Sequence, residues 1–141
     1  MPPEQRRLKR LHRLEQVRAI AKQAAAQDAA SAESTLQQLR GLAERTRILA
    51  NGYDARSLAA DGHALRQLSQ FVTGLSGISA STERDALAAQ GLADRKQQEL
   101  ALAERARAAA ETRAGTQAQV VAARLARPEL SARRTVGTEL E

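Results

Sequence analysis

The chain has 141 residues and a formal net charge of +6, from 22 Lys and Arg against 16 Asp and Glu. Hydrophobic residues make up 43% of it, yet alanine is the commonest of them and aromatic residues contribute only 1%. Alanine buries little surface and aromatic side chains usually dominate a core, so this composition excludes a thick globular core. The absence of cysteine excludes a disulfide framework and a Cys-based zinc site.

The composition predicts an elongated, all-α protein. Strong helix formers are abundant, whereas the β-branched and aromatic residues that favour strands are few. No apolar run approaches the length of a membrane span, and the N-terminus is too polar for a secretory signal, so we expect a cytoplasmic protein. The basic charge makes nucleic acid, an acidic membrane or an acidic protein partner candidate ligands.

Turn signals divide the chain into two helices within one expected domain, 1–141. The first helix is predicted over about 5–50, because Asn51-Gly52-Tyr53-Asp54 combines C-cap and turn residues. Asp61-Gly62 adds a second break, with Asp61 as a possible N-cap, so the connection is placed at 51–63. The second helix is predicted over about 64–126, before Pro128, and is followed by a frayed tail over 127–141.

Apolar residues recur at alternating steps of three and four along both helices, which predicts a coiled-coil seam. In the first helix the clean part of this seam comprises Ala25, Ala29, Ala32, Leu36, Leu39, Ala43, Thr46 and Ala50. Towards the N-terminus, Leu14, Val17 and Ala21 join it only through two successive steps of four, which would locally relax the supercoil.

The seam of the second helix keeps the same spacing throughout. Its members are Leu65, Leu68, Val72, Leu75, Ser79, Thr82, Ala86, Ala89, Ala93, Lys96, Leu100, Ala103, Arg107, Ala110, Ala114, Gln117 and Val121. The unbroken spacing favours one helix that passes through its glycines. An alternative starts a new helix at Thr82, with Thr82 and Asp85 as a capping box. The two seams together predict a long antiparallel two-helix coiled-coil hairpin.

Several large apolar residues fall beside the seams instead of in them. Phe71 and Ile78 form a stripe with Leu75, and Leu42 and Leu49 lie next to Leu39 in the first helix. A two-helix hairpin cannot cover such a stripe completely, so we expect it to dock a partner. The alternative is local packing on the connection, under Tyr53 or Leu58.

At these residues the chain resembles the flagellar export protein FliJ family. The resemblance covers nearly the whole chain and depends on its length, the two-helix layout and the Asn51-Gly52 break. It also includes "AESTLQQL" at Ala32 to Leu39 and "QFVTGLSGI" at Gln70 to Ile78.

The resemblance implies a stalk-like, non-enzymatic part of the flagellar type III export apparatus, peripheral at the inner membrane. Members of this family insert the end with both termini into the export ATPase hexamer, contact the cytoplasmic linker of the export-gate membrane protein, and bind export chaperones. It implies membrane association only through these partners, and no cofactor. The matching gate-docking positions are Leu39, Leu42, Phe71, Leu75 and Ile78.

Charge predicts a basic tip independently of the resemblance. Five basic residues lie in the first thirteen positions, and an antiparallel hairpin would bring C-terminal arginines to the same end. The residues of this expected ATPase-facing tip are Arg6, Arg7, Lys9, Arg10, Arg13, Arg124 and Arg127. The alternative is that these side chains are simply solvated.

Catalysis and metal binding have little support in the sequence. His12 and His63 are far apart and neither has a second ligand at i+4, so no metal site is expected. Two other functions stay open as alternatives. One is a flagellar or type III export chaperone; the other is a basic coiled coil that binds nucleic acid, which the near absence of aromatic stacking residues disfavours.

Overall fold

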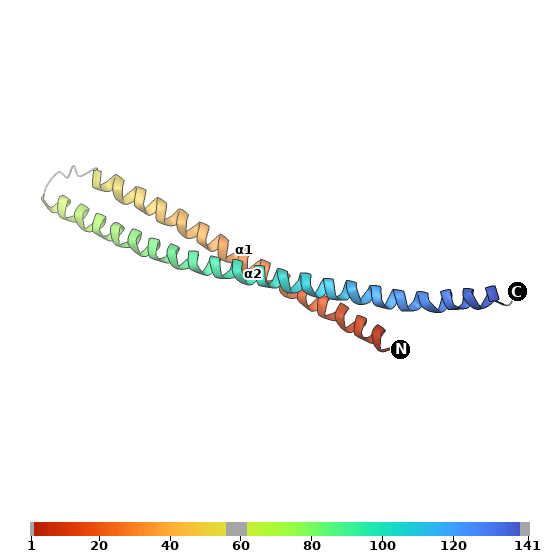
Figure 1. Ribbon diagram of the computed structural model, residues 1–141. Helices are drawn as coiled ribbons and strands as arrows, with labels where there is room; N and C mark the ends of the chain where they lie inside the picture. The colour runs from red at the N-terminus through yellow and green to blue at the C-terminus, as the bar shows by residue number, and fades with distance from the viewer. Residues whose placement is uncertain (1, 56–61, 139–141) are drawn as a thin grey trace. The chain divides into compact units, whose positions relative to one another are not determined.

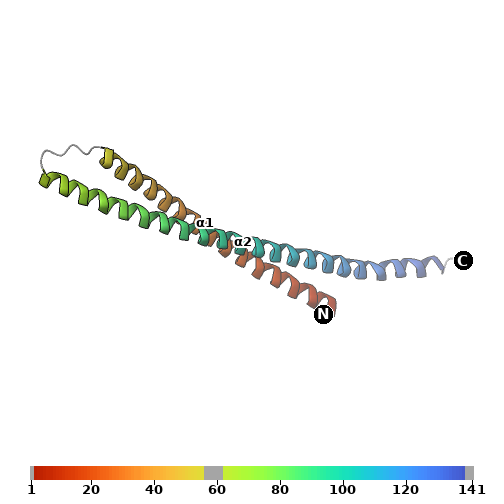
Figure 2. The ribbon, with the colours of Figure 1, turned by 60° about the vertical axis from the view of Figure 1, so that its left-hand side comes forward.

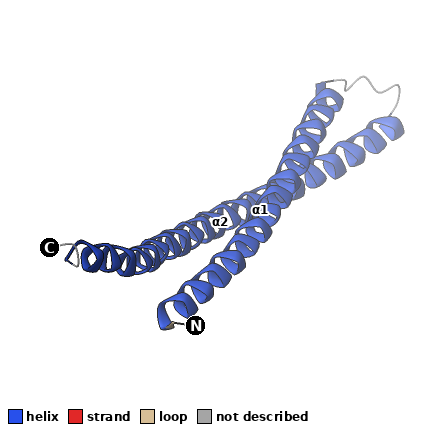
Figure 3. Ribbon diagram, turned by 90° about the vertical axis from the view of Figure 1, so that its right-hand side faces the viewer, coloured by secondary structure: helices blue, strands red, loops and turns tan. Residues whose placement is uncertain are grey.

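The computed structural model describes residues 2–55 and 62–138, and every described residue except Pro2 is helical (Figures 1 and 3). Helix α1 is Pro3–Ala55, with 53 residues, and α2 is Gly62–Thr138, with 77 residues. The two long helices pack against each other, and the described residues contain no strand. The predicted all-α helical hairpin is therefore confirmed.

Helix α1 extends further than the sequence indicated. It ends at Ala55, so the predicted end near Ala50 and the turn at Asn51-Gly52 are wrong. The seam explains the extension: Ala50 is buried, and Tyr53, one step further along, is half-buried against α2. Packing there offsets the helix-propensity cost of a glycine, which is about 1 kcal/mol. Leu58 and Asp61, proposed as a packing residue and an N-cap, lie outside the described residues.

Helix α2 is also longer than predicted. It passes Thr82 without a break, so the alternative of a new helix with a capping box there is wrong. The Thr82 hydroxyl instead donates to the Ile78 carbonyl at 2.7 Å, a bond typical of a helix interior. The helix continues through Pro128 to Thr138, so the predicted end near Ala126 is wrong. Proline lacks one N–H and so removes one hydrogen bond of the ladder, to the Arg124 carbonyl.

Packing divides the chain into two compact units. The terminal unit comprises 1–25 and 100–141, and the hairpin unit comprises 26–99. In the hairpin unit, the C-terminal part of α1 and the N-terminal part of α2 run side by side in opposite directions (Figures 1 and 2). The described helices are in no place both long and apolar enough to cross a membrane.

The predicted seam forms the core of the hairpin unit. Its α1 members are buried or half-buried, and Leu36, 1% exposed, is the only large side chain that is fully buried among those described. Leu36 packs with Ala32 and Ala93, and Ala89 lies against this cluster. On α2 the predicted positions from Leu68 onwards are also buried or half-buried. Leu65 is an exception: it is half-exposed and lies before the point where Tyr53 meets α2.

The seam of the terminal unit differs from the prediction on its α1 side. Val17 is 61% exposed and Ala21 is exposed, so the predicted seam through them is wrong. Half-buried residues instead occur on the unrelaxed three-and-four spacing that runs back from Ala25, at Lys22, Glu15, Leu11, Leu8 and Glu4, although Arg18, which falls on the same spacing, is exposed. Leu14 of the predicted seam is half-buried as well. Long charged side chains can cover alanine with their aliphatic stems, which allows charged residues in the seam.

Leu36→Ala is expected to lower the free energy of unfolding by about 2–3 kcal/mol, because it opens a cavity in the fully buried cluster. Leu87→Ala is the matched control, since Leu87 is 72% exposed on the same unit. Denaturant unfolding followed by circular dichroism measures both. Equal losses in the two variants would contradict the assignment of Leu36 to the core.

Candidate functional site

The hairpin unit carries a row of exposed apolar side chains beside its seam, here called the apolar flank. Each member directly precedes a seam residue of its own helix and is 40–57% exposed. The members are Leu42, Leu49, Phe71, Ile78 and Leu92. In an antiparallel coiled coil, positions that precede the same type of seam residue on both helices lie along one side of the pair. The apolar flank is therefore one surface built from α1 and α2.

A ring contact joins the two helices at one end of the apolar flank. The rings of Tyr53 and Phe71 meet edge to face, with centroids 5.0 Å apart and an interplanar angle of 80°. Phe71 is nevertheless 49% exposed, and Ile78, two turns further along α2, is 57% exposed. Tyr53 thus supplies the local packing that the sequence offered as an alternative, but it covers only part of Phe71.

Two of the predicted docking residues are also members of the predicted seam, and the structure covers them. Leu75 is buried at 9% exposure, and Leu39 is half-buried. Leu42, Phe71 and Ile78 are the predicted docking residues that remain exposed. The sequence stripe of Phe71, Leu75 and Ile78 therefore splits into one seam residue and two flank residues. The sequence prediction missed Leu92. This residue directly precedes the seam residue Ala93, just as Ile78 directly precedes Ser79, so the same spacing could have identified it.

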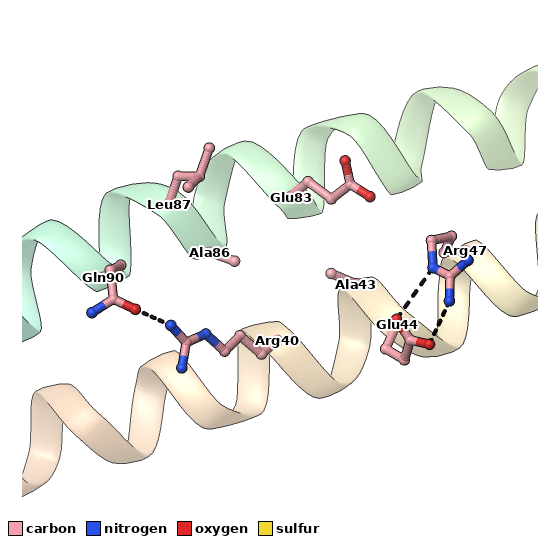
Figure 4. Close-up of a pocket in the computed structure, with 8 residues that line it drawn as sticks. All are labelled: Arg40, Ala43, Glu44, Arg47, Glu83, Ala86, Leu87 and Gln90. Atoms are coloured by element: carbon pink, nitrogen blue, oxygen red, sulfur yellow. Dashed lines mark hydrogen bonds and ion pairs between the residues drawn. The ribbon is translucent and has the colours of Figure 1, made fainter.

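The opposite side of the hairpin unit is polar. A hollow of about 400 Å³ lies between α1 and α2 there, with Ala43 and Ala86 facing each other across its floor (Figure 4). Arg40 donates to the Gln90 amide oxygen across the hollow, and Gln90 in turn donates to Asp94 at 3.0 Å. These polar residues directly follow seam residues, so the two sides of the hairpin differ in chemistry.

Two pairs of side chains interact within the polar hollow, Arg40 with Gln90 and Arg47 with Glu44. Arg47 forms an ion pair with Glu44 at 2.6 Å, and this hydrogen bond lowers the pKa of the Glu44 carboxyl. Both side chains are about half-exposed, so the pair adds little to stability. The hollow offers no pairing of a nucleophile with a base that would support covalent catalysis. Across residues 2–55 and 62–138, no cluster of three or more His, Cys, Asp or Glu could hold a metal ion.

The terminal unit places the first turn of α1 against the part of α2 that holds Gln117 and Arg124, so Arg124 lies beside the N-terminal basic residues as the sequence predicted. Arg124 forms an ion pair with the Glu4 carboxylate, and the buried Gln117 side chain donates to the Glu4 carbonyl at 3.2 Å. The first turn of α1 is thus held against α2 by two polar contacts. Arg124 therefore lies at the basic tip, and Arg127, also exposed, lies nearly one turn further along α2.

The predicted basic residues of α1 all stay exposed. Arg6, Lys9, Arg10 and Arg13 line one open hollow of about 450 Å³ together with Pro3. No ion pair joins any of these four cations to a residue in the described part of the chain. Both acidic residues of the first 25 positions, Glu4 and Glu15, are half-buried in the seam. The cations and the carboxylates thus occupy opposite faces of α1.

Comparison with protein-family models, with curated proteins and with solved structures gives no match.

The pKa of Glu4 is expected to rise towards the ordinary glutamate value of about 4.3 in an Arg124→Gln variant, because the hydrogen bond from Arg124 is what lowers it. With a lowered folded-state pKa, the contact is complete above the ordinary value and is lost as the pH falls through the lowered one. A carboxyl-carbon NMR titration measures this change. Arg127→Gln is the matched control and should leave the Glu4 pKa unchanged; an equal rise in both variants would exclude a specific pair.

Proposed function

We propose that this protein is a non-enzymatic component of the flagellar type III export apparatus, which serves flagellum assembly and motility. In this role it links the export ATPase to the export gate and acts in the cytoplasm at the inner membrane. The observation that carries the proposal is the apolar flank, because three of the docking positions implied by the FliJ resemblance, Leu42, Phe71 and Ile78, are exposed together on it.

The apolar flank is the proposed surface for the cytoplasmic linker of the gate protein. An exposed apolar row on an otherwise polar hairpin is typical of a protein interface. Phe71 supplies the kind of aromatic anchor that contributes most to such interfaces, and Tyr53 orients its ring. Leu39 and Leu75 support the row from within the seam and are not themselves the contact surface.

The basic tip is the proposed surface for the ATPase hexamer. Its unpaired cations can be steered towards an acidic pore or surface, and this attraction weakens with salt. The Glu4–Arg124 ion pair and the Gln117 bond hold the two helices together at this end. Export chaperones are a further proposed class of partner, which the resemblance alone supports.

Addition of the protein to the export ATPase of the same genome is expected to produce a pull-down complex and a changed ATP hydrolysis rate. Arg6→Glu with Arg10→Glu should weaken the complex at least tenfold, because each reversal turns an attraction into a repulsion. Arg84→Glu with Arg95→Glu is the matched control, since both residues are exposed in the hairpin unit. Absence of both binding and any rate change with the unaltered protein would refute the ATPase role.

Ile78→Gln is expected to leave the thermal unfolding of the protein nearly unchanged and to weaken binding of the gate linker about tenfold or more. The reason is that Ile78 is more than half exposed in the isolated protein. Phe71→Gln should show the same binding loss together with a stability loss of about 0.5–1.5 kcal/mol from the Tyr53 ring contact. Isothermal titration with the purified linker and circular dichroism measure the two effects.

The matched control for gate binding is Leu87→Gln, which removes an exposed leucine that lies outside the apolar flank. It should bind the linker as the unaltered protein does. If Ile78→Gln melts far earlier but binds normally once folded, the flank serves local packing and not docking.

A further inference from the structure

The outer face of α1 in the terminal unit carries a second surface with a distinct chemistry, here called the outer stripe. It runs through positions spaced alternately by four and three residues, on the side of α1 away from the seam. Its members are Arg6, Arg10, Arg13, Val17 and Ile20. Cations thus occupy its first half and branched apolar side chains its second half.

The apolar half of the outer stripe has no packing role in the terminal unit. Val17 is 61% exposed and Ile20 is 68% exposed, while the seam runs on the other side of the helix through Leu8 and Leu11. Ile20 is the most exposed large apolar residue in the described part of this unit. Val17 and Ile20 lie directly beyond Arg13, so the aliphatic stems of the arginines and these apolar side chains form one continuous surface.

The cationic half of the outer stripe has the charge of an anion-binding site. Lys9 joins Arg6, Arg10 and Arg13 around one open hollow, and none of the four is neutralised by a described carboxylate. Residues 1–25 contain seven Lys or Arg against two Glu, and both Glu lie on the seam side. A hollow lined by four cations is complementary in charge to a phosphate group.

We propose that the outer stripe binds the surface of an anionic membrane, with Arg6, Lys9, Arg10 and Arg13 on lipid phosphates and Val17 and Ile20 inserted beside them. A lipid surface uses both halves of the stripe, whereas nucleic acid gains little from two exposed aliphatic side chains and finds no Phe, Tyr or Trp for stacking in residues 1–25. The stripe also lies on the exposed face of a single helix, so it suits a broad surface better than a shaped protein pocket.

This inference shares four cations with the proposed ATPase-facing tip but does not depend on that role. It also goes beyond an association with the membrane through partners alone. Direct binding would concentrate the protein at the membrane, and the same cations could then serve either the lipid or a protein surface but not both at once.

The test is co-sedimentation of the full chain with vesicles of phosphatidylglycerol and phosphatidylcholine, compared with vesicles of phosphatidylcholine alone. Binding is expected only to the anionic vesicles, and it should weaken with added salt. Arg10→Gln with Arg13→Gln should lower the partition coefficient about 25-fold, because each cation near an anionic surface contributes about fivefold. Val17→Gln with Ile20→Gln should lower it about tenfold through lost apolar burial.

Matched controls lie in the hairpin unit, and all the substituted side chains are exposed, so the fold should survive. Arg84→Gln with Arg95→Gln removes the same charge, and Leu87→Gln removes an exposed apolar residue; both should bind vesicles nearly as the unaltered protein does. Equal losses in the stripe and control variants would overturn the proposal. So would equal binding to neutral vesicles, or tight duplex DNA binding without vesicle binding. The assay contains no ATPase and no gate protein, so its failure would leave the proposed export role untouched.

Discussion

Along much of the seam the two helices meet through alanine, and this contact determines what the rest of the molecule can do. Alanine lets two backbones approach closely but removes little apolar surface from water at each layer. Stability must therefore be spread along the whole seam, with Leu36 as the one large side chain that is fully buried in the described residues. A seam this narrow has no room for Phe71 or Ile78, so they remain on the flank. The exposed apolar flank is in this sense a consequence of the alanine seam.

Polar residues in the seam have two different roles. The Thr46 and Thr82 hydroxyls each donate to the carbonyl four residues earlier in their own helix, at 2.7 Å, so they are satisfied without a partner across the seam. These two threonines can therefore be buried, but they do not determine which residues of the two helices pack against each other. Gln117 instead reaches across to the Glu4 carbonyl, and a shift of one layer would break that bond. The register of the terminal unit therefore depends on a specific polar contact, whereas that of the hairpin unit depends on the fit of Leu36 among alanines.

Sequence periodicity predicted the all-α hairpin and the seam where small and apolar residues alone occupy it, from Ala25 to Ala50 in α1. It failed nearer the N-terminus, because charged residues at Glu15 and Lys22 interrupt the apolar pattern and Leu14 with Val17 offers a false one. The turn signal at Asn51-Gly52 failed for another reason: a local preference of about 1 kcal/mol does not end a helix whose next seam residue, Tyr53, packs against α2. At Pro128 packing is not the reason, because residues 122–127 just before it are all exposed. The FliJ resemblance implied docking positions but did not distinguish seam residues from flank residues. Leu75 lies in the seam, whereas Ile78, less than one turn further along α2, lies on the flank.

The observed register of α1 also explains why its cations form a free surface. A seam through Leu14, Val17 and Ala21 would continue by the same spacing to Arg10, and would place that guanidinium between the helices. The register in the structure instead half-buries Glu4 and Glu15 and leaves Arg10 exposed. Glu4 has Arg124 as its partner, and Glu15 has His12 at 3.6 Å. The same register places Val17 and Ile20 on the exposed face of α1, beside the arginines. The register of α1 thus places a basic patch and an apolar patch on one exposed helix face.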